Sequence, residues 1–155
     1  MNIGKLIEQS NKEGDDVWIA GGASQESVEA LEKAMGFKLP SSYRSFLLNF
    51  GGLYVMDCAL SGIVSDDPLK LEGGNIYADT LNMRDEYSKV CDVPQHLWVV
   101  EPHEDGAYCF DINHPMPEDE FGIVNFEPGQ YNPKSPEILA VSFNEYVENW
   151  YFGGE

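Results

Sequence analysis

The stretch FKLPSSYRSFLLNFGG, residues 37–52, constrains the fold more than any other part of the chain. Pro40 suits the first turn of a helix, where its missing N–H costs no hydrogen bond. Apolar residues then recur at helical spacing and form one stripe, made of Tyr43, Phe46, Leu47 and Phe50. Gly51 and Gly52 end the helix, because glycine tolerates the positive φ that follows many helix C-termini. The chain must therefore build a core against this helix.

Two further helices are predicted before this one. Ile3, Leu6 and Ile7 share one face of a short amphipathic helix at the start of the chain. Ser24 is a good N-cap for a second helix, which Gly36 ends. The second helix and the Pro40 helix together predict a helical hairpin with an apolar seam.

The rest of the chain favours strands. The segments VWI (17–19), CALSGIVS (58–65), LWVV (97–100), AYCFDI (107–112) and FGIVNF (121–126) have strand patterns. Asp105-Gly106 predicts a hairpin turn between two of them. A helix is predicted over residues 75–90, and Ser142-x-x-Glu145 is a capping box that opens a last helix. Because the links are too short for parallel crossovers, we expect the α+β class: one domain over residues 1–155, with N-terminal helices, a mainly antiparallel sheet and a C-terminal helix.

Charge is distributed unevenly along this chain, whose net charge is −18. Residues 1–89 contain eight Lys or Arg and fourteen Asp or Glu, whereas residues 90–155 contain one cation, Lys134, and thirteen acids. Such a surface would repel nucleic acid and anionic membranes and attract a basic protein. A merely solvated acidic surface is the alternative. We take the acids of three loops as candidate partner-binding residues: Asp66, Asp67, Glu101, Glu104, Asp105, Glu118, Asp119 and Glu120.

The cysteines and histidines predict neither a disulfide framework nor a metal site. Cys58, Cys91 and Cys109 are widely spaced and odd in number, which favours reduced thiols in the cytoplasm. The start MNIGKLIEQSNKEGDD lacks the apolar run of a signal peptide, and no window reaches the ~18 apolar residues of a membrane span. The spacing of the remaining candidates, His96, His103, Cys109 and His114, fits no structural zinc pattern. We therefore expect a cytoplasmic protein without metal or cofactor.

Catalysis is not predicted either. Glu101, His103, Glu104 and Asp105 combine carboxylates with an imidazole, but we expect them on an exposed turn, where burial is too slight to shift their pKa values. Cys58 is interpreted as a packed thiol rather than a nucleophile. We therefore predict no catalytic residues.

The order of these motifs resembles the SUKH superfamily, the Smi/Knr-type domains, over residues 24–150. The matching positions are Leu39-Pro40, Tyr43-Arg44, Gly51-Gly52, Phe110-Asp111 and Ser142-Phe143. Phe50 departs from the pattern, because the family often has Asn before the two glycines.

The resemblance implies a binding domain. Bacterial members are mostly immunity proteins for polymorphic toxins, many of them nucleases, and fungal members regulate cell-wall synthesis and signalling through protein contacts. Our main hypothesis is an immunity protein whose acidic loops bind and neutralise a basic nuclease toxin. A regulatory scaffold, or a small enzyme or cation-binding protein, are the alternatives. Trp18, Tyr108 and Tyr131 are either core residues or exposed anchors for the partner, which the sequence leaves open.

Overall fold

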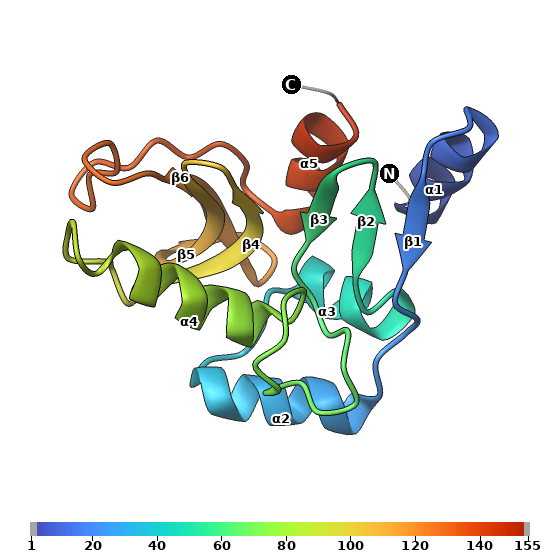
Figure 1. The fold of residues 1–155 in the computed structure, drawn as a ribbon, viewed down its shortest axis with the longest axis horizontal. Coiled ribbons are helices and arrows are strands. Elements are labelled where there is room, and N and C mark those ends of the chain that lie inside the picture. The colour runs from blue at the N-terminus through green and yellow to red at the C-terminus, as the bar shows by residue number, and fades with distance from the viewer. Residues whose placement is uncertain (1–2, 154–155) are drawn as a thin grey trace.

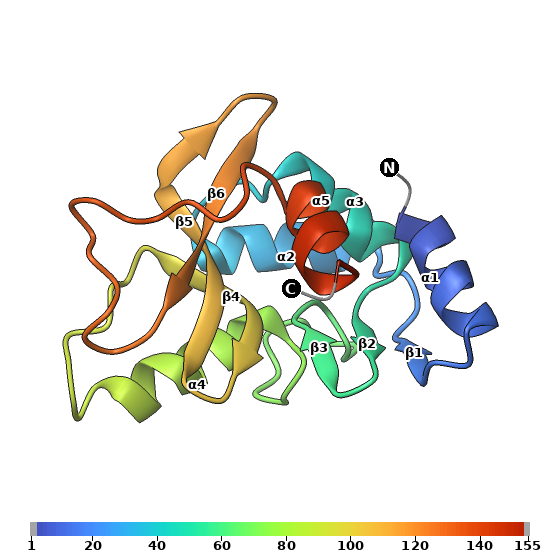
Figure 2. The same cartoon turned by 90° about the horizontal axis from the view of Figure 1, so that it is seen from above.

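A computed structural model describes residues 3–153 of the chain (Figures 1 and 2). Its helices are α1 (Ile3–Lys12), α2 (Gln25–Met35), α3 (Ser41–Asn49), α4 (Ile76–Tyr87) and α5 (Phe143–Tyr146), and α5 continues into a π-helical segment, η1 (Val147–Tyr151). Its strands are β1 (Val17–Ile19), β2 (Leu53–Val55), β3 (Cys58–Leu60), β4 (Leu97–His103), β5 (Gly106–Met116) and β6 (Glu120–Phe126).

The N-terminal helices follow their sequence signals. The Ser24 side chain accepts a hydrogen bond from the backbone N–H of Ser27 at 3.1 Å, and Gly36 ends α2 with a φ of 88°. Tyr43, Phe46 and Leu47 of the predicted stripe are buried, Phe50 is half-buried, and Gly51 adopts a φ of 74° after it. A side chain at Gly51 would also collide with the carbonyl oxygen of Gly21, so the position requires glycine for space as well as for φ. The predicted helical hairpin is confirmed.

Within residues 3–153 the strands form two antiparallel sheets, in the orders β1-β2-β3 and β4-β5-β6. The α+β class with antiparallel strands is confirmed, but one sheet was expected where two are found. The strand predicted over 58–65 ends at Leu60. Beyond it, Gly62 forms an isolated parallel β-bridge with Asn75. Strand β2 was not predicted, because its three residues directly follow the glycine pair that ends α3.

The C-terminal sheet is covered on both faces. Leu97, Val99 and Cys109 point toward α4, where they pack with Met83. Alternate residues of the same strands point the other way and enter the main core, which contains the aromatic side chains of α3 and α5. Figure 2 shows α4 and α5 on opposite sides of this sheet.

The last helix begins at the predicted cap and changes from α-helical to π-helical hydrogen bonding after Tyr146. The Ser142 side chain accepts a hydrogen bond from the backbone N–H of Glu145 at 3.0 Å. Phe143 and Tyr146 are buried, and the ring of Phe143 lies 4.9 Å from that of Tyr43 in an edge-to-face contact. Ser142 therefore caps α5, and the contact between Phe143 and Tyr43 packs this helix against α3.

Candidate partner-binding surface

The eight predicted acids divide into two groups. Asp66, Asp67, Glu104, Asp105, Glu118 and Asp119 are exposed, as expected for partner-binding loops. The expectation is wrong for Glu101 and Glu120, which are buried, with 9% and 7% of their surface exposed. These two carboxylates belong to strands rather than to loops.

Glu120 joins two helices to the C-terminal sheet. Its carboxylate accepts hydrogen bonds from the backbone N–H of Ser42 at 2.7 Å, from the Ser42 hydroxyl at 2.8 Å and from the backbone N–H of Phe143 at 3.2 Å. Both N–H groups lie at helix N-termini, where a negative charge is stabilising. Glu120 is therefore a structural residue, unsuited to contact a partner.

Glu101 belongs to β4, and its side chain contacts the last helix. It accepts a hydrogen bond from the hydroxyl of Tyr146, and it pairs across the sheet with Tyr108. Burial raises the pKa of the Glu101 carboxyl, and the hydrogen bond from Tyr146 opposes this rise only in part. The assumption that this carboxyl sits on an exposed turn with little burial is therefore wrong for Glu101.

The six exposed acids do not form one face. Glu104 and Asp105 lie in the β4–β5 turn, and Glu118 and Asp119 lie in the β5–β6 turn, which is at the opposite end of the sheet (Figure 2). At about 3.3 Å per residue, the length of β5 separates these turns by roughly 35 Å. These two acidic loops therefore do not form one surface on this sheet.

An exposed apolar surface lies instead on the N-terminal sheet. Trp18, Tyr54 and Ala59 are direct neighbours across β1, β2 and β3, so their side chains share one face. Trp18 is 52% exposed, which is unusual for so large a side chain. Beside it lies a pocket of about 580 Å³, lined by Asp16, Trp18, Leu53, Tyr54, Ala59, Leu60, Val64, Gly73 and Gly74. We call the outer surface formed by Asp16, Trp18, Tyr54, Asp57 and Ala59 the Trp18 face.

Carboxylates border the Trp18 face. The Tyr54 hydroxyl donates a hydrogen bond to Asp57 at 3.3 Å, and Asp16 lines the pocket. Desolvation, and then the negative charges of Asp57 and Asp16, raise the pKa of Tyr54. A neighbouring hollow shares Val64 with this pocket and includes Asp66, one of the predicted acids. An exposed Trp, a half-buried Tyr and several carboxylates therefore lie close together on this side of the molecule.

The other two aromatic candidates are held by the fold. The Tyr131 hydroxyl donates to the buried carboxylate of Asp111 at 3.0 Å, and Tyr108 packs between His103 and Tyr146 with ring distances of 4.7 and 5.8 Å. Both side chains are half-buried. Of the three aromatic residues that the sequence left open, Trp18 is the exposed one. The glycines that flank Trp18 and the shortness of its strand were the sequence features that could have indicated its exposure.

The thiol and imidazole side chains are dispersed. Cys58 is exposed, so the expectation of a packed thiol is wrong. Burial, followed by the nearby Glu101, raises the pKa of the Cys58 thiol, which disfavours the nucleophilic thiolate. Cys109 is buried against α4, and His114 contacts Asp111 at 3.0 Å. Among residues 3–153, no three His, Cys, Asp or Glu side chains are grouped so that they could hold a metal ion.

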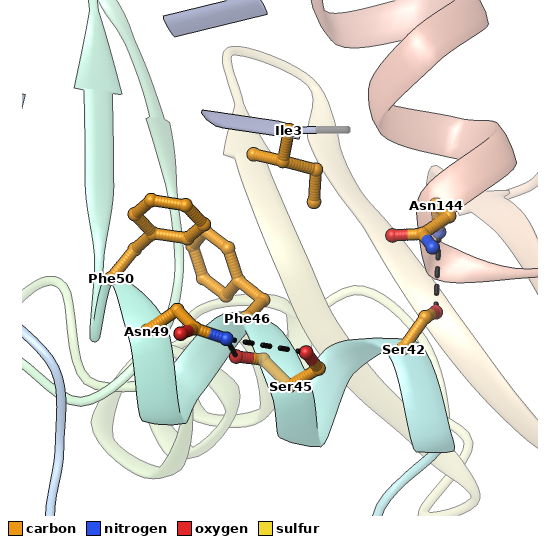
Figure 3. A pocket seen from close by; sticks show the side chains of 7 residues that line it. All are labelled: Ile3, Ser42, Ser45, Phe46, Asn49, Phe50 and Asn144. Atoms are coloured by element: carbon orange, nitrogen blue, oxygen red, sulfur yellow. Dashed lines mark hydrogen bonds between the residues drawn. The ribbon is translucent and has the colours of Figure 1, made fainter. Parts of the chain in front are cut away.

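A second hollow of about 460 Å³ lies between α1, α3 and α5 (Figure 3). Ile3, Phe46 and Phe50 supply apolar walls, and the polar residues around it are Ser42, Ser45, Asn49 and Asn144. The polar side chains of α3 bond to their neighbours: Asn49 donates to the Ser45 carbonyl at 2.8 Å, and Ser42 donates to Glu120. No charged side chain lines this hollow within residues 3–153, so it offers a basic partner less than the Trp18 face does.

These features define a small α+β domain with an exposed aromatic surface bordered by carboxylates. A family model described as SUKH_5, SMI1-KNR4 cell-wall, matches residues 3–152. The chain belongs to this family, which confirms the resemblance seen in the motifs.

The chain is also similar to the "Uncharacterized protein YnaB" of Bacillus subtilis (strain 168). The two are 31% identical over 91 residues, which cover 59% of this chain and 51% of that protein. The match thus spans about half the length of this relative. None of the helices within residues 3–153 has the length and hydrophobicity needed to cross a lipid bilayer.

Proposed function

We propose that this protein is an immunity protein that binds a cognate basic toxin stoichiometrically and thereby neutralises it in the cytoplasm. The carrying observation is the Trp18 face, where an exposed Trp and a half-buried Tyr lie next to a pocket bordered by carboxylates. Membership of the SUKH family supports the proposal, because the resemblance implies binding domains of this kind.

Physical chemistry favours this surface for a protein partner. Trp and Tyr are the side chains that most often dominate binding energy, because each buries a large rigid area at small entropic cost. A net charge of −18 attracts a basic partner at long range and speeds encounter. We propose a nuclease as the toxin, because the surface that holds phosphates must be basic and would be attracted to this chain. In this proposal the domain has no catalytic residues of its own.

Co-expression with the toxin encoded by the neighbouring gene tests the proposal. Cells that carry both proteins should survive induction of the toxin, and the purified pair should migrate as a complex of equal stoichiometry. Death of these cells together with the absence of any complex would reject the proposal for that pair.

The description of the family includes the words "cell-wall" and favours a regulatory scaffold as the second candidate. Capture of enzymes of cell-wall synthesis by the purified protein, with no effect on toxicity, would support that function instead.

A further inference from the structure

The pocket of the Trp18 face combines three features that together suit one kind of side chain. Trp18 and Tyr54 line it with aromatic rings, Val64, Gly73 and Gly74 are further lining residues, and Asp16 contributes a carboxylate. At about 580 Å³ it is large enough for a long side chain to enter along its stem.

Both carboxylates lie beside the aromatic row at one end of the sheet, where β1 begins and β2 turns into β3, because the backbone N–H of Met56 donates to the Asp16 carbonyl at 2.8 Å. Asp57 accepts the Tyr54 hydroxyl hydrogen bond at 3.3 Å, and Asp16 precedes β1, whose Trp18 is the direct cross-strand neighbour of Tyr54. Both carboxylates are exposed and no ion pair to either is found within residues 3–153. A cation over the aromatic rings would therefore meet two negative charges at this end of the row.

A guanidinium already stacks on a Trp ring at another place in this protein. Inside the fold, the guanidinium carbon of Arg84 lies 4.6 Å from the centroid of the Trp98 ring. A planar guanidinium stacks on an aromatic ring and donates in its own plane, whereas a lysine ammonium is more strongly hydrated and does not stack.

We propose that the pocket of the Trp18 face receives an arginine side chain of the partner protein. The aliphatic stem fills the apolar pocket, the guanidinium lies against Trp18 and Tyr54, and its N–H groups donate to Asp16 and Asp57. This inference rests on the proposed function and specifies the part of a basic partner that the domain recognises. A basic partner and an acidic rim are complementary in charge, which selects arginine over an apolar side chain.

The test uses the full chain labelled with ¹⁵N and three small probes: acetyl-arginine amide, acetyl-citrulline amide and acetyl-leucine amide. Citrulline has the shape of arginine without the charge. We expect the arginine probe to shift the Trp18 indole N–H and the Gly73 and Gly74 amide signals saturably, with a Kd on the order of 1 mM. Citrulline and leucine should bind at least about tenfold more weakly.

The variant D16N/D57N should weaken the arginine probe about tenfold, because both charge-assisted hydrogen bonds become neutral. The matched control E104Q/D105N removes the same charge from the exposed β4–β5 turn and should change the Kd less than about twofold. Equal binding of citrulline or leucine, no saturable shift with the arginine probe, or an unchanged Kd in D16N/D57N would overturn the inference. A toxin complex that needs Trp18 while the arginine probe fails would overturn only this inference and leave the proposed function standing.

Discussion

Two carboxylates within the strands of the C-terminal sheet, Glu101 and Glu120, are buried against helices, whereas Asp16 and Asp57 beside the N-terminal sheet are exposed next to aromatic side chains. Glu120 accepts hydrogen bonds at two helix N-termini, and Glu101 is buried beneath Tyr146. Asp16 and Asp57 border Trp18, which is 52% exposed. The half of the chain with the larger excess of acids is therefore not the half that exposes aromatic side chains beside carboxylates. Charge counted along a sequence reports attraction at long range, and the place of contact depends on which side chains the fold exposes.

The substitution with the largest expected effect on stability is Glu120→Ala. Removing this carboxylate leaves buried donors of α3 and α5 without a partner, so we expect a loss of about 3 kcal/mol in the free energy of unfolding. Denaturant unfolding measures it. Glu118→Ala, in the exposed turn of the same hairpin, is the control and should cost less than about 0.5 kcal/mol. Equal effects of the two substitutions would show that Glu120 is not a structural link.

Replacing Glu101 with a neutral side chain should raise the free energy of unfolding at neutral pH, whereas Glu120→Ala should lower it. Because burial raises the pKa of this carboxyl in the folded state, the folded protein retains the proton to higher pH than the unfolded chain does. Stability contributed by the protonated group is thus lost as pH rises through the folded-state pKa. We expect Glu101→Gln, which still accepts from Tyr146, to be more stable than the parent above that range and to lose this pH dependence.

Unfolding curves from about pH 4 to pH 8 measure this difference. Glu104→Gln, on the neighbouring exposed turn, should leave the pH dependence unchanged. A Glu101→Gln protein that is less stable than the parent at neutral pH would contradict the assigned direction of the shift.

The sequence predicts the scaffold better than it predicts the site, for physical reasons. Helix caps, apolar stripes and the hairpin signal at Asp105-Gly106 are local, and the helices and long strands follow from them, although the turn itself is Glu104-Asp105 and Gly106 begins β5 opposite His103. Glycine at position 106 turns out to be required by packing as well, since a side chain there would lie 1.9 Å from the carbonyl oxygen of Phe126. The burial of Glu101 and Glu120, in contrast, depends on partners 45 and 78 residues distant in the chain.

The Trp18 face was missed for a related reason. Trp18 is exposed because β1 pairs with β2, a strand that the sequence did not reveal. Once β2 is in place, alternation along the strands puts Trp18 and Tyr54 on the outer face and Leu53 and Val55 in the core. The family resemblance suggested the class of function that we propose, but it pointed to no residues of this surface.

A smaller effect is expected at the β2–β3 turn, which borders the Trp18 face. Met56 has a φ of 59° and is 53% exposed, so its left-handed backbone is strained without compensating burial. Met56→Gly should raise the free energy of unfolding by up to about 1 kcal/mol, because glycine adopts this φ without strain. Ala59→Gly, in the adjacent strand, should instead lower it. A loss of stability in Met56→Gly would mean that its side chain is held by contacts.

The smallest effect is expected from the exposed acids of the C-terminal sheet. Neutralising Glu104, Asp105, Glu118 and Asp119 to their amides should slow association with the toxin less than about threefold at physiological salt, since these turns act only through long-range attraction. Dissociation should not change. Stopped-flow or surface-binding kinetics measure both rates, and a faster dissociation would place these turns in the interface.

The comparison between the two sheets is tested most directly by co-expressing the toxin with two variants of this chain. One variant is W18A/Y54A, and the other carries the four neutralised acids of the C-terminal sheet. Thermal unfolding first confirms that both variants are folded. We predict that W18A/Y54A weakens the complex about a hundredfold and fails to protect the cell, while the second variant protects it as the parent does. Full protection by W18A/Y54A, together with loss of protection in the second variant, would contradict the account.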